Sequence, residues 1–231
     1  MNREDGKMKN IILSASLMCA NFKNLEKDLK ILEKEGINFI HIDIMDGHFV
    51  PNIALSPLII ESLKDTTNIP FDAHLMVENP VIFIDKLIGI KTDLITLHIE
   101  TIKKYAFRII EQIKSQDIKV GIALNPVTSL YELEQIYHIV DKITIMTVDP
   151  GFAGQNFIPE MISKIEKLRK IKEEGGYKFI IEVDGGIGKE TSLKVIQSGA
   201  QMLTLGTSWL FKKPLNLQKR MREIREFIIS I

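Results

Sequence analysis

The strongest constraint on this chain is the regular alternation of short strand-forming runs with longer helix-forming segments. Eight runs rich in β-branched and aromatic residues recur at residues 11–13, 39–44, 71–77, 94–98, 120–124, 143–148, 179–183 and 202–205. Charged segments with helical periodicity lie between them, for example at residues 24–35, 81–87, 105–115, 160–174 and 189–198. Strands that alternate with helices pair in parallel through helical crossovers.

Eight such units within 231 residues predict a closed barrel, a single (β/α)8 TIM barrel. An open, doubly wound sheet is the alternative that the alternation alone allows. No linker, low-complexity tract or shift in composition divides the chain, so the pattern indicates one domain. Because chemistry in such barrels sits at the carboxyl ends of the strands, the informative residues are the polar ones where each run ends.

Charge and cysteine content limit which kinds of partner the protein is expected to bind and in which cellular compartment it is expected. Thirty basic residues balance thirty acidic ones, so no net charge attracts nucleic acid or an anionic membrane. Cys19 is the single cysteine and has no partner for an internal disulfide, while residues 1–10 are polar and unlike a signal peptide. No apolar run is long enough to cross a bilayer. The sequence therefore predicts a cytoplasmic protein that binds neither nucleic acid nor membrane.

Potential metal ligands end three of the predicted strands. The second run contains His41-Ile42-Asp43, the third contains His74, and the seventh ends at Asp184. Side chains two residues apart on a strand share a face, so His41 and Asp43 point to the same side. Two imidazoles and two carboxylates at one barrel mouth predict a site for one divalent metal ion, namely zinc, cobalt, manganese or iron.

The other histidines are not assigned to this site. His98 ends the fourth run, but the sequence offers no partner for it. His138 lies in a segment with helical character and is expected at the surface.

Glycine-rich segments follow the last three strands. The sequences Asp184-Gly185-Gly186-Ile187-Gly188 and Gly206-Thr207-Ser208 lie in the two adjacent loops where barrels commonly bind phosphate through backbone N–H groups. A third segment, residues 149–155, follows the sixth run and carries a central aromatic residue, Phe152. These segments predict a phosphate site and a loop that covers a ligand.

Taken together, these residues resemble the ribulose-phosphate 3-epimerase family over residues 14–211. Within the family the sequence is more similar to the D-allulose-6-phosphate 3-epimerases, on the evidence of Ser16-Leu17-Met18-Cys19, residues 41–52, residues 141–161 with Thr147-Val148-Asp149, and Gly206-Thr207-Ser208. Pentose-phosphate enzymes of the family usually read Ser-Val-Asn in place of Thr147-Val148-Asp149. Gly186, where the allulose-phosphate enzymes can carry serine, is a pentose-like feature.

The resemblance implies a barrel of the ribulose-phosphate-binding type over residues 11–231, preceded by a loose extension over residues 1–10. It implies that His41, Asp43, His74 and Asp184 bind the metal, and that Asp43 and Asp184 are also the catalytic acid and base. The implied substrate-binding residues are Ser16, His74, Gly151, Phe152, Ala153, Gly154, Asp184, Gly185, Gly186, Gly206, Thr207 and Ser208, while Met45, Met76 and Met146 would line the site. A homo-oligomer, either a dimer or a hexamer, is also implied.

The predicted reaction inverts C3 of a phosphorylated ketose. Removing a proton from one face and returning one to the other requires two groups, so Asp43 and Asp184 are expected to exchange the roles of acid and base across a metal-stabilised enediolate. D-allulose 6-phosphate, converted to D-fructose 6-phosphate, is the first predicted substrate, and D-ribulose 5-phosphate, converted to D-xylulose 5-phosphate, is the second.

Two further alternatives concern other activities of the same fold. Barrels that decarboxylate sugar phosphates or add carbon to them carry an Asp-x-Lys-x-x-Asp strand, and Met45 stands here in place of that lysine. A non-catalytic phosphosugar-binding barrel would be expected to have lost a carboxylate, and this sequence keeps both.

Overall fold

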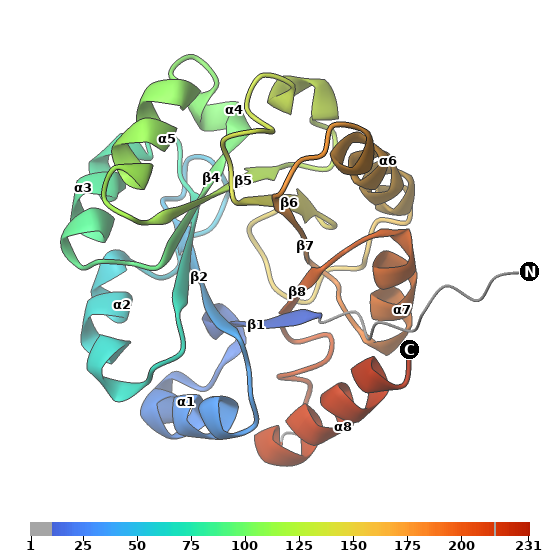
Figure 1. Ribbon diagram of the computed structural model, residues 1–231. Helices are drawn as coiled ribbons and strands as arrows, with labels where there is room; N and C mark the ends of the chain where they lie inside the picture. The colour runs from blue at the N-terminus through green and yellow to red at the C-terminus, as the bar shows by residue number, and fades with distance from the viewer. Residues whose placement is uncertain (1–10, 215) are drawn as a thin grey trace, which may run out of the picture.

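The computed structural model describes residues 11–214 and 216–231, and these form a closed barrel of parallel strands (Figure 1). Each strand pairs with the next along the chain, and β1 pairs with β8 to close the ring. The strands are β1 (Ile12–Ser16), β2 (Phe39–Met45), β3 (Phe71–Met76), β4 (Leu94–His98), β5 (Lys119–Leu124), β6 (Lys142–Met146), β7 (Ile180–Asp184) and β8 (Met202–Leu205). The predicted (β/α)8 barrel is confirmed, and the open sheet is excluded.

Helices surround the barrel on the outside, as Figure 1 shows. They are α1 (Leu25–Lys34), α2 (Pro57–Leu63), α3 (Val81–Gly89), α4 (Ile99–Ile102), α5 (Ala106–Lys114), α6 (Met161–Glu174), α7 (Lys189–Ser198) and α8 (Leu217–Ile229). Short 3-10 helices add η1 (Leu17–Cys19), η2 (Phe22–Asn24), η3 (Lys64–Thr66) and η4 (Leu130–Leu133). None of the described helices combines the length and the apolar character needed to cross a membrane.

Several strand bounds differ from the sequence prediction by one to three residues, the largest difference being β1, which extends to Ser16. Two further details concern His138 and the sixth strand. The connection between β5 and β6 contains η4 and turns, so His138 is exposed as expected but lies in a turn and not in a helix. The sixth strand ends at Met146, two residues before its predicted end, where its pairing with β7 ends at Asp184. The backbone N–H of Thr147 donates to the carbonyl oxygen of Asp184 at 2.7 Å.

The barrel has an apolar outer layer and an unusually polar interior. Outward-facing strand residues such as Ile40, Ile42 and Ile44 are buried beneath the helices in one continuous hydrophobic core. The alternate residues are also buried but include many polar side chains, namely Ser14, Ser16, His41, Asp43, Asp72, His74, Thr96, His98, Lys142, Thr144, Glu182 and Thr204. Buried polar groups are costly unless they are hydrogen-bonded, so this interior must contain a connected polar network.

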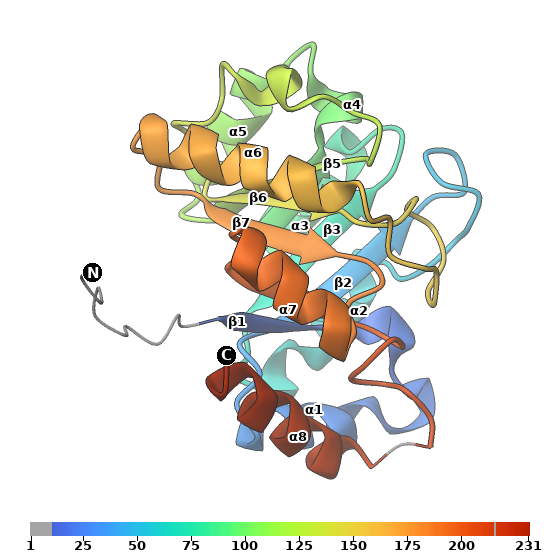
Figure 2. The same ribbon diagram turned by 90° about the vertical axis from the view of Figure 1, so that its right-hand side faces the viewer.

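The loops at the two ends of the barrel differ in length. In Figure 2 the long connections after β2 and β6 extend beyond the carboxyl ends of the strands, while β1 begins and α8 ends on the opposite side of the molecule. The carboxyl end of the ring is therefore the end at which loops can enclose a ligand.

Candidate active site

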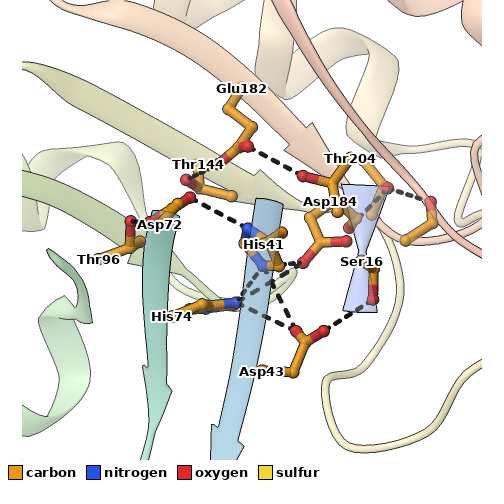
Figure 3. Close-up of polar contacts among 12 residues, drawn as sticks. Ser16, His41, Asp43, Asp72, His74, Thr96, Thr144, Glu182, Asp184 and Thr204 are labelled. Carbon is orange, nitrogen blue, oxygen red and sulfur yellow. Dashed lines mark hydrogen bonds and ion pairs between the residues drawn. The ribbon is translucent and has the colours of Figure 1, made fainter. Parts of the chain in front are cut away.

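Four side chains from β2, β3 and β7 converge at the carboxyl end of the barrel (Figure 3). The Nε2 atom of His41 lies 3.0 Å from Nδ1 of His74, 3.4 Å from Oδ1 of Asp43 and 3.5 Å from Oδ2 of Asp184. Nδ1 of His74 lies 3.7 Å from both of those carboxylate oxygens. In the ring β7 is separated from β2 by β8 and β1, so Asp184 meets the other three across the barrel interior.

The spacing of these four atoms suits a metal ion. Donor atoms held about 2.0–2.1 Å from one tetrahedral ion lie roughly 3.3 Å from one another. The five separations given above, 3.0–3.7 Å, bracket that value, and all four atoms lie within 4.8 Å of one another. Two imidazole nitrogens and two carboxylate oxygens are also a donor set that several divalent metals accept. The chain therefore contains a His/Asp site able to hold a divalent metal ion.

Each histidine of this set has a partner on its outer nitrogen. Nδ1 of His41 lies 3.0 Å from Oδ2 of Asp72, and Nε2 of His74 lies 2.9 Å from Nε2 of His98. Both imidazoles are fully buried, so these partners fix the orientation of the rings. Metal-binding histidines characteristically have such a partner on the nitrogen that does not bind the metal.

The electrostatics around His41 favour positive charge. Burial alone would lower the pKa of His41, but the carboxylates of Asp43, Asp184 and Asp72 raise it well above its ordinary value. Burial alone would likewise raise the pKa of Asp43, and His41 and His74 instead hold it well below its usual range. Carboxylates that stay ionised in a buried site attract a cation to the point where they meet.

A second polar cluster fills the barrel beneath these donors. The ammonium of the fully buried Lys142 on β6 contacts the carboxylates of Asp72 on β3 and Glu182 on β7. Thr144 donates to Glu182 at 2.6 Å, and Thr96 donates to Asp72 at 2.6 Å. Lys142 therefore bridges two carboxylates across the interior, and through Asp72 this cluster supports His41.

A pocket opens directly above the four donors. Most of the predicted site residues line it: Ser16, Asp43, Gly151, Phe152, Ala153, Gly154, Asp184, Gly185, Gly186, Gly206, Thr207 and Ser208, together with Met45, Met76 and Met146. His41 and His74 do not line this pocket and have no exposed surface. His74 lies within the group of four potential metal donors, and its contact with substrate stays a prediction. Ser16 donates to Oδ2 of Asp43 at 2.8 Å.

The glycine-rich end of the pocket is shaped for an anion. Gly185 and Gly186 adopt φ angles of +112° and +65°, and a Cβ at Gly186 would lie 2.7 Å from the backbone nitrogen of Phe157. Side chains are therefore excluded there, which leaves backbone accessible to a ligand. The hydroxyl oxygen of Thr207, also on the pocket wall, is buried without a hydrogen-bond partner among the described residues. A phosphate oxygen is a suitable partner for it.

The loop after β6 closes one side of the pocket and is tied to the loop after β2. The side-chain amide of Asn52 donates to the carbonyl oxygen of Gly151 at 2.7 Å. Val50 packs against Gly151 so closely that a Cβ added at Gly151 would lie 3.2 Å from the Cβ of Val50. Phe152, at the centre of the loop, keeps 51% of its surface exposed beside the pocket.

Sequence reasoning missed the residues that support the donors. Asp72 precedes His74 by two positions and Glu182 precedes Asp184 by two, so strand periodicity places each of them on the interior face and could have identified them. The sequence offers no partner for His98 because that partner, His74, lies on the neighbouring strand. The predicted sixth strand begins at residue 143 and so excludes the charged Lys142.

The chain is similar to known proteins over most of its length. The Ribulose-phosphate 3 epimerase family matches residues 12–210. Ribulose-phosphate 3-epimerase of Bacillus subtilis is 41% identical over 86% of this chain and 91% of its own length. The enzyme of the same name from Methanocaldococcus jannaschii is 42% identical over 94% and 90% of the two chains. The chloroplastic ribulose-5-phosphate-3-epimerase of Arabidopsis thaliana is 41% identical over 86% and 71%.

Solved structures of lower identity share the fold. 3-Hexulose-6-phosphate synthase from Salmonella typhimurium superposes with a TM-score of 0.70 at 14% identity, over 95% of this chain and 99% of that one. A tryptophan synthase alpha-subunit from Pyrococcus furiosus gives 0.68 at 14% identity, over 97% and 99%. The extent of the family match, together with the relatives above 40% identity, shows that this chain belongs to the ribulose-phosphate 3-epimerase family, a family of isomerases.

Proposed function

We propose that this protein is a metal-dependent epimerase that inverts C3 of a phosphorylated ketose, with D-ribulose 5-phosphate as its substrate and D-xylulose 5-phosphate as its product. One observation carries the proposal: Asp43 and Asp184, from different sides of the ring, meet at one metal-donor set on the floor of a pocket with a glycine-rich wall. Epimerisation needs two proton-transfer groups, and this geometry supplies two carboxylates.

In the proposed mechanism the substrate lies above the donors, between the two carboxylates. One of them accepts the C3 proton while the other, as the acid, donates to the opposite face, and the roles exchange in the reverse reaction. Ser16 holds Asp43 in place through its hydrogen bond. The bound divalent ion supplies positive charge that stabilises the negative charge developing on the substrate. Gly185, Gly186, Gly206, Thr207 and Ser208 bind the phosphate.

We favour the pentose phosphate because the allulose-like residues Thr147 and Asp149 do not line the pocket, whereas the pentose-like residue Gly186 does. Thr147 does not line the pocket, and its hydroxyl donates to the carbonyl oxygen of Asp184 at 2.9 Å, a bond that serine can make equally well. Asp149 is exposed and does not line the pocket. Gly186, the pentose-like residue, does line it. The relatives above 40% identity bear the names of ribulose-phosphate epimerases.

D-Allulose 6-phosphate, the first substrate that the sequence predicted, is the second candidate. Met18 and Cys19, which belong to the allulose-like segment, both line the pocket. The two substrates differ by one hydroxymethylene group, and a difference of that size typically changes the binding free energy by about 1–3 kcal/mol. Two side chains on the pocket wall are sufficient for an effect of this magnitude.

The test is turnover of both substrates by the same preparation, stripped of metal and reloaded with zinc, cobalt, manganese or iron. We expect kcat/KM for ribulose 5-phosphate to exceed that for allulose 6-phosphate by at least about tenfold. A preference in the opposite direction would reverse the choice of substrate and leave the mechanism intact. Turnover of neither substrate with any of the four metals would contradict the proposed function.

A further inference from the structure

A line of contacts runs outward from the buried His74 to the partly buried carboxylate of Glu100. Nε2 of His74 lies 2.9 Å from Nε2 of His98, and Nδ1 of His98 lies 3.3 Å from Oε2 of Glu100. The rings of His74 and His98 are nearly parallel, at 13°, with centroids 5.0 Å apart, so they meet edge to edge through these nitrogens. Both rings are fully buried, so bulk water cannot replace the contact between them.

The far end of this line is fixed by donors to Glu100. Its Oε1 atom accepts from the backbone N–H of Asn125 at 2.8 Å and from the hydroxyl of Thr128. An ionised carboxylate has no proton to donate, so Oε2 can only accept from His98. Phe49 packs against the His98 ring, with centroids 4.7 Å apart, and restricts its movement.

The direction of every hydrogen bond in the line follows from that acceptor. A neutral imidazole carries one N–H and one lone pair. Because Glu100 accepts, His98 carries its hydrogen on Nδ1 and has a lone pair on Nε2. His74 must then carry its hydrogen on Nε2 to donate to His98. The lone pair of His74 is left on Nδ1, which is the atom that faces His41, Asp43 and Asp184.

We propose that Glu100 and His98 are positioning residues that fix the tautomer of His74, so that its Nδ1 is available to the metal. The inference rests on the metal site of the proposed function. His41 has a simpler arrangement, in which Asp72 contacts the outer nitrogen directly. Each of the two donor histidines is therefore linked to a carboxylate. His41 contacts the buried Asp72 directly, and His74 is linked to the partly buried Glu100 through the imidazole of His98.

Glu100→Gln is the informative substitution because it reverses the direction of the hydrogen bonds between residue 100, His98 and His74 while keeping the shape of the side chain. The amide oxygen is required where Asn125 and Thr128 donate, so the NH2 group faces Nδ1 of His98. His98 must then carry its hydrogen on Nε2, pointing at His74, which moves the His74 hydrogen to Nδ1. The metal would have to displace that hydrogen. Glu132→Gln, an identical change at an exposed residue of η4, is the matched control.

The first measurement is the affinity of each metal-free protein for Co²⁺, by competition with a chromophoric chelator. We expect Glu100→Gln to weaken binding by about 10- to 100-fold and Glu132→Gln to match the unsubstituted protein. The second measurement is the imidazole ¹⁵N NMR spectrum of the zinc-loaded proteins. It should show the His98 hydrogen on Nδ1 in the unsubstituted protein and on Nε2 in Glu100→Gln. Weakened binding with an unchanged His98 tautomer would mean a merely structural role and would overturn the inference.

A second pair of variants keeps the test decisive if Glu100→Gln fails to fold. His98→Gln retains an acceptor for the N–H of His74, whereas His98→Phe keeps a ring but removes the acceptor. We expect His98→Gln to bind Co²⁺ at least about tenfold more tightly than His98→Phe. Equal affinities would refute the proposal that His98 fixes the tautomer of His74. Absence of Co²⁺ binding by the unsubstituted protein would instead refute the metal site of the proposed function, so the two failures are distinguishable.

Discussion

At the scale of single residues, Asp43 and Asp184 carry the proposed chemistry. Asp43→Asn and Asp184→Asn keep the side-chain volume but remove the charge and the basicity. We expect each variant to lower kcat by about 10³-fold or more, since general acid–base groups typically contribute 10²- to 10⁴-fold and both residues are also proposed metal ligands. Steady-state kinetics on ribulose 5-phosphate would measure the loss, and circular dichroism would check the fold. Near-normal turnover in either variant would exclude that residue as acid or base.

Glu100 gives a pH dependence of stability. Burial alone would raise its pKa, but hydrogen bonds from His98, Thr128 and Asn125 hold the pKa at about 2, below its ordinary value of 4.5. A carboxyl whose folded-state pKa is depressed stabilises the fold above its unfolded pKa, and this contribution is lost as the pH falls from about 4.5 toward about 2. Burial of Lys164 nearby lowers the pKa of that amine to about 8, so the amine keeps its positive charge throughout this acidic range.

The measurement is urea unfolding of the metal-free protein and of Glu100→Gln at pH 6 and pH 3.5. The stability advantage of the unsubstituted protein should shrink by about 1 kcal/mol between these two pH values. A difference that stays constant with pH would show that Glu100 titrates alike in the folded and unfolded chains.

At the scale of elements, the turns before and after β7 offer a matched pair of glycines. Gly186 and Gly176 have nearly equal φ angles, +65° and +63°, but only Gly186 has backbone within reach of an added Cβ. Gly176→Ala should cost about 1 kcal/mol, the left-handed penalty alone. Gly186→Ala should cost at least about 1 kcal/mol more and raise KM for the phosphorylated substrate. Urea unfolding and kinetics would measure both effects, and equal costs would show that the turn adapts to a side chain.

The elements that the sequence predicted well are those with a strong period. Strand β2 begins at its predicted residue, Phe39, and the shared inward face of His41 and Asp43 is confirmed. The contact between His74 and His98 could not be predicted, because it depends on how two neighbouring rings orient inside the barrel. The position of Thr147 was also inaccessible, since a motif shows which residue is present but not which way its side chain points.

At the scale of the whole molecule, Lys142 connects strands that lie apart in the sequence. Replacing it with methionine would leave the carboxylates of Asp72 and Glu182 buried without their cation. Breaking a buried ion pair from one side typically costs about 3–5 kcal/mol. Lys86→Met, which breaks an exposed pair with Glu61, is the control and should cost no more than about 1 kcal/mol. Urea unfolding of both variants would compare the costs, and similar values would mean that the interior relaxes around the loss.

The homo-oligomer and the cytoplasmic location that the sequence suggested stay predictions, and the predicted extension over residues 1–10 lies outside the described residues. The barrel itself follows from the alternation of strands and helices. The polar interior is harder to predict from the sequence, because each charged side chain there is stable only when it is hydrogen-bonded to the others.

The first strand begins and the last helix ends on the side of the barrel away from the pocket (Figure 2). A tag, a surface anchor or a fused protein attached after α8 would therefore project from the face opposite the pocket. Immobilising this protein through its C-terminal helix should leave the loops over the pocket free to admit sugar phosphates.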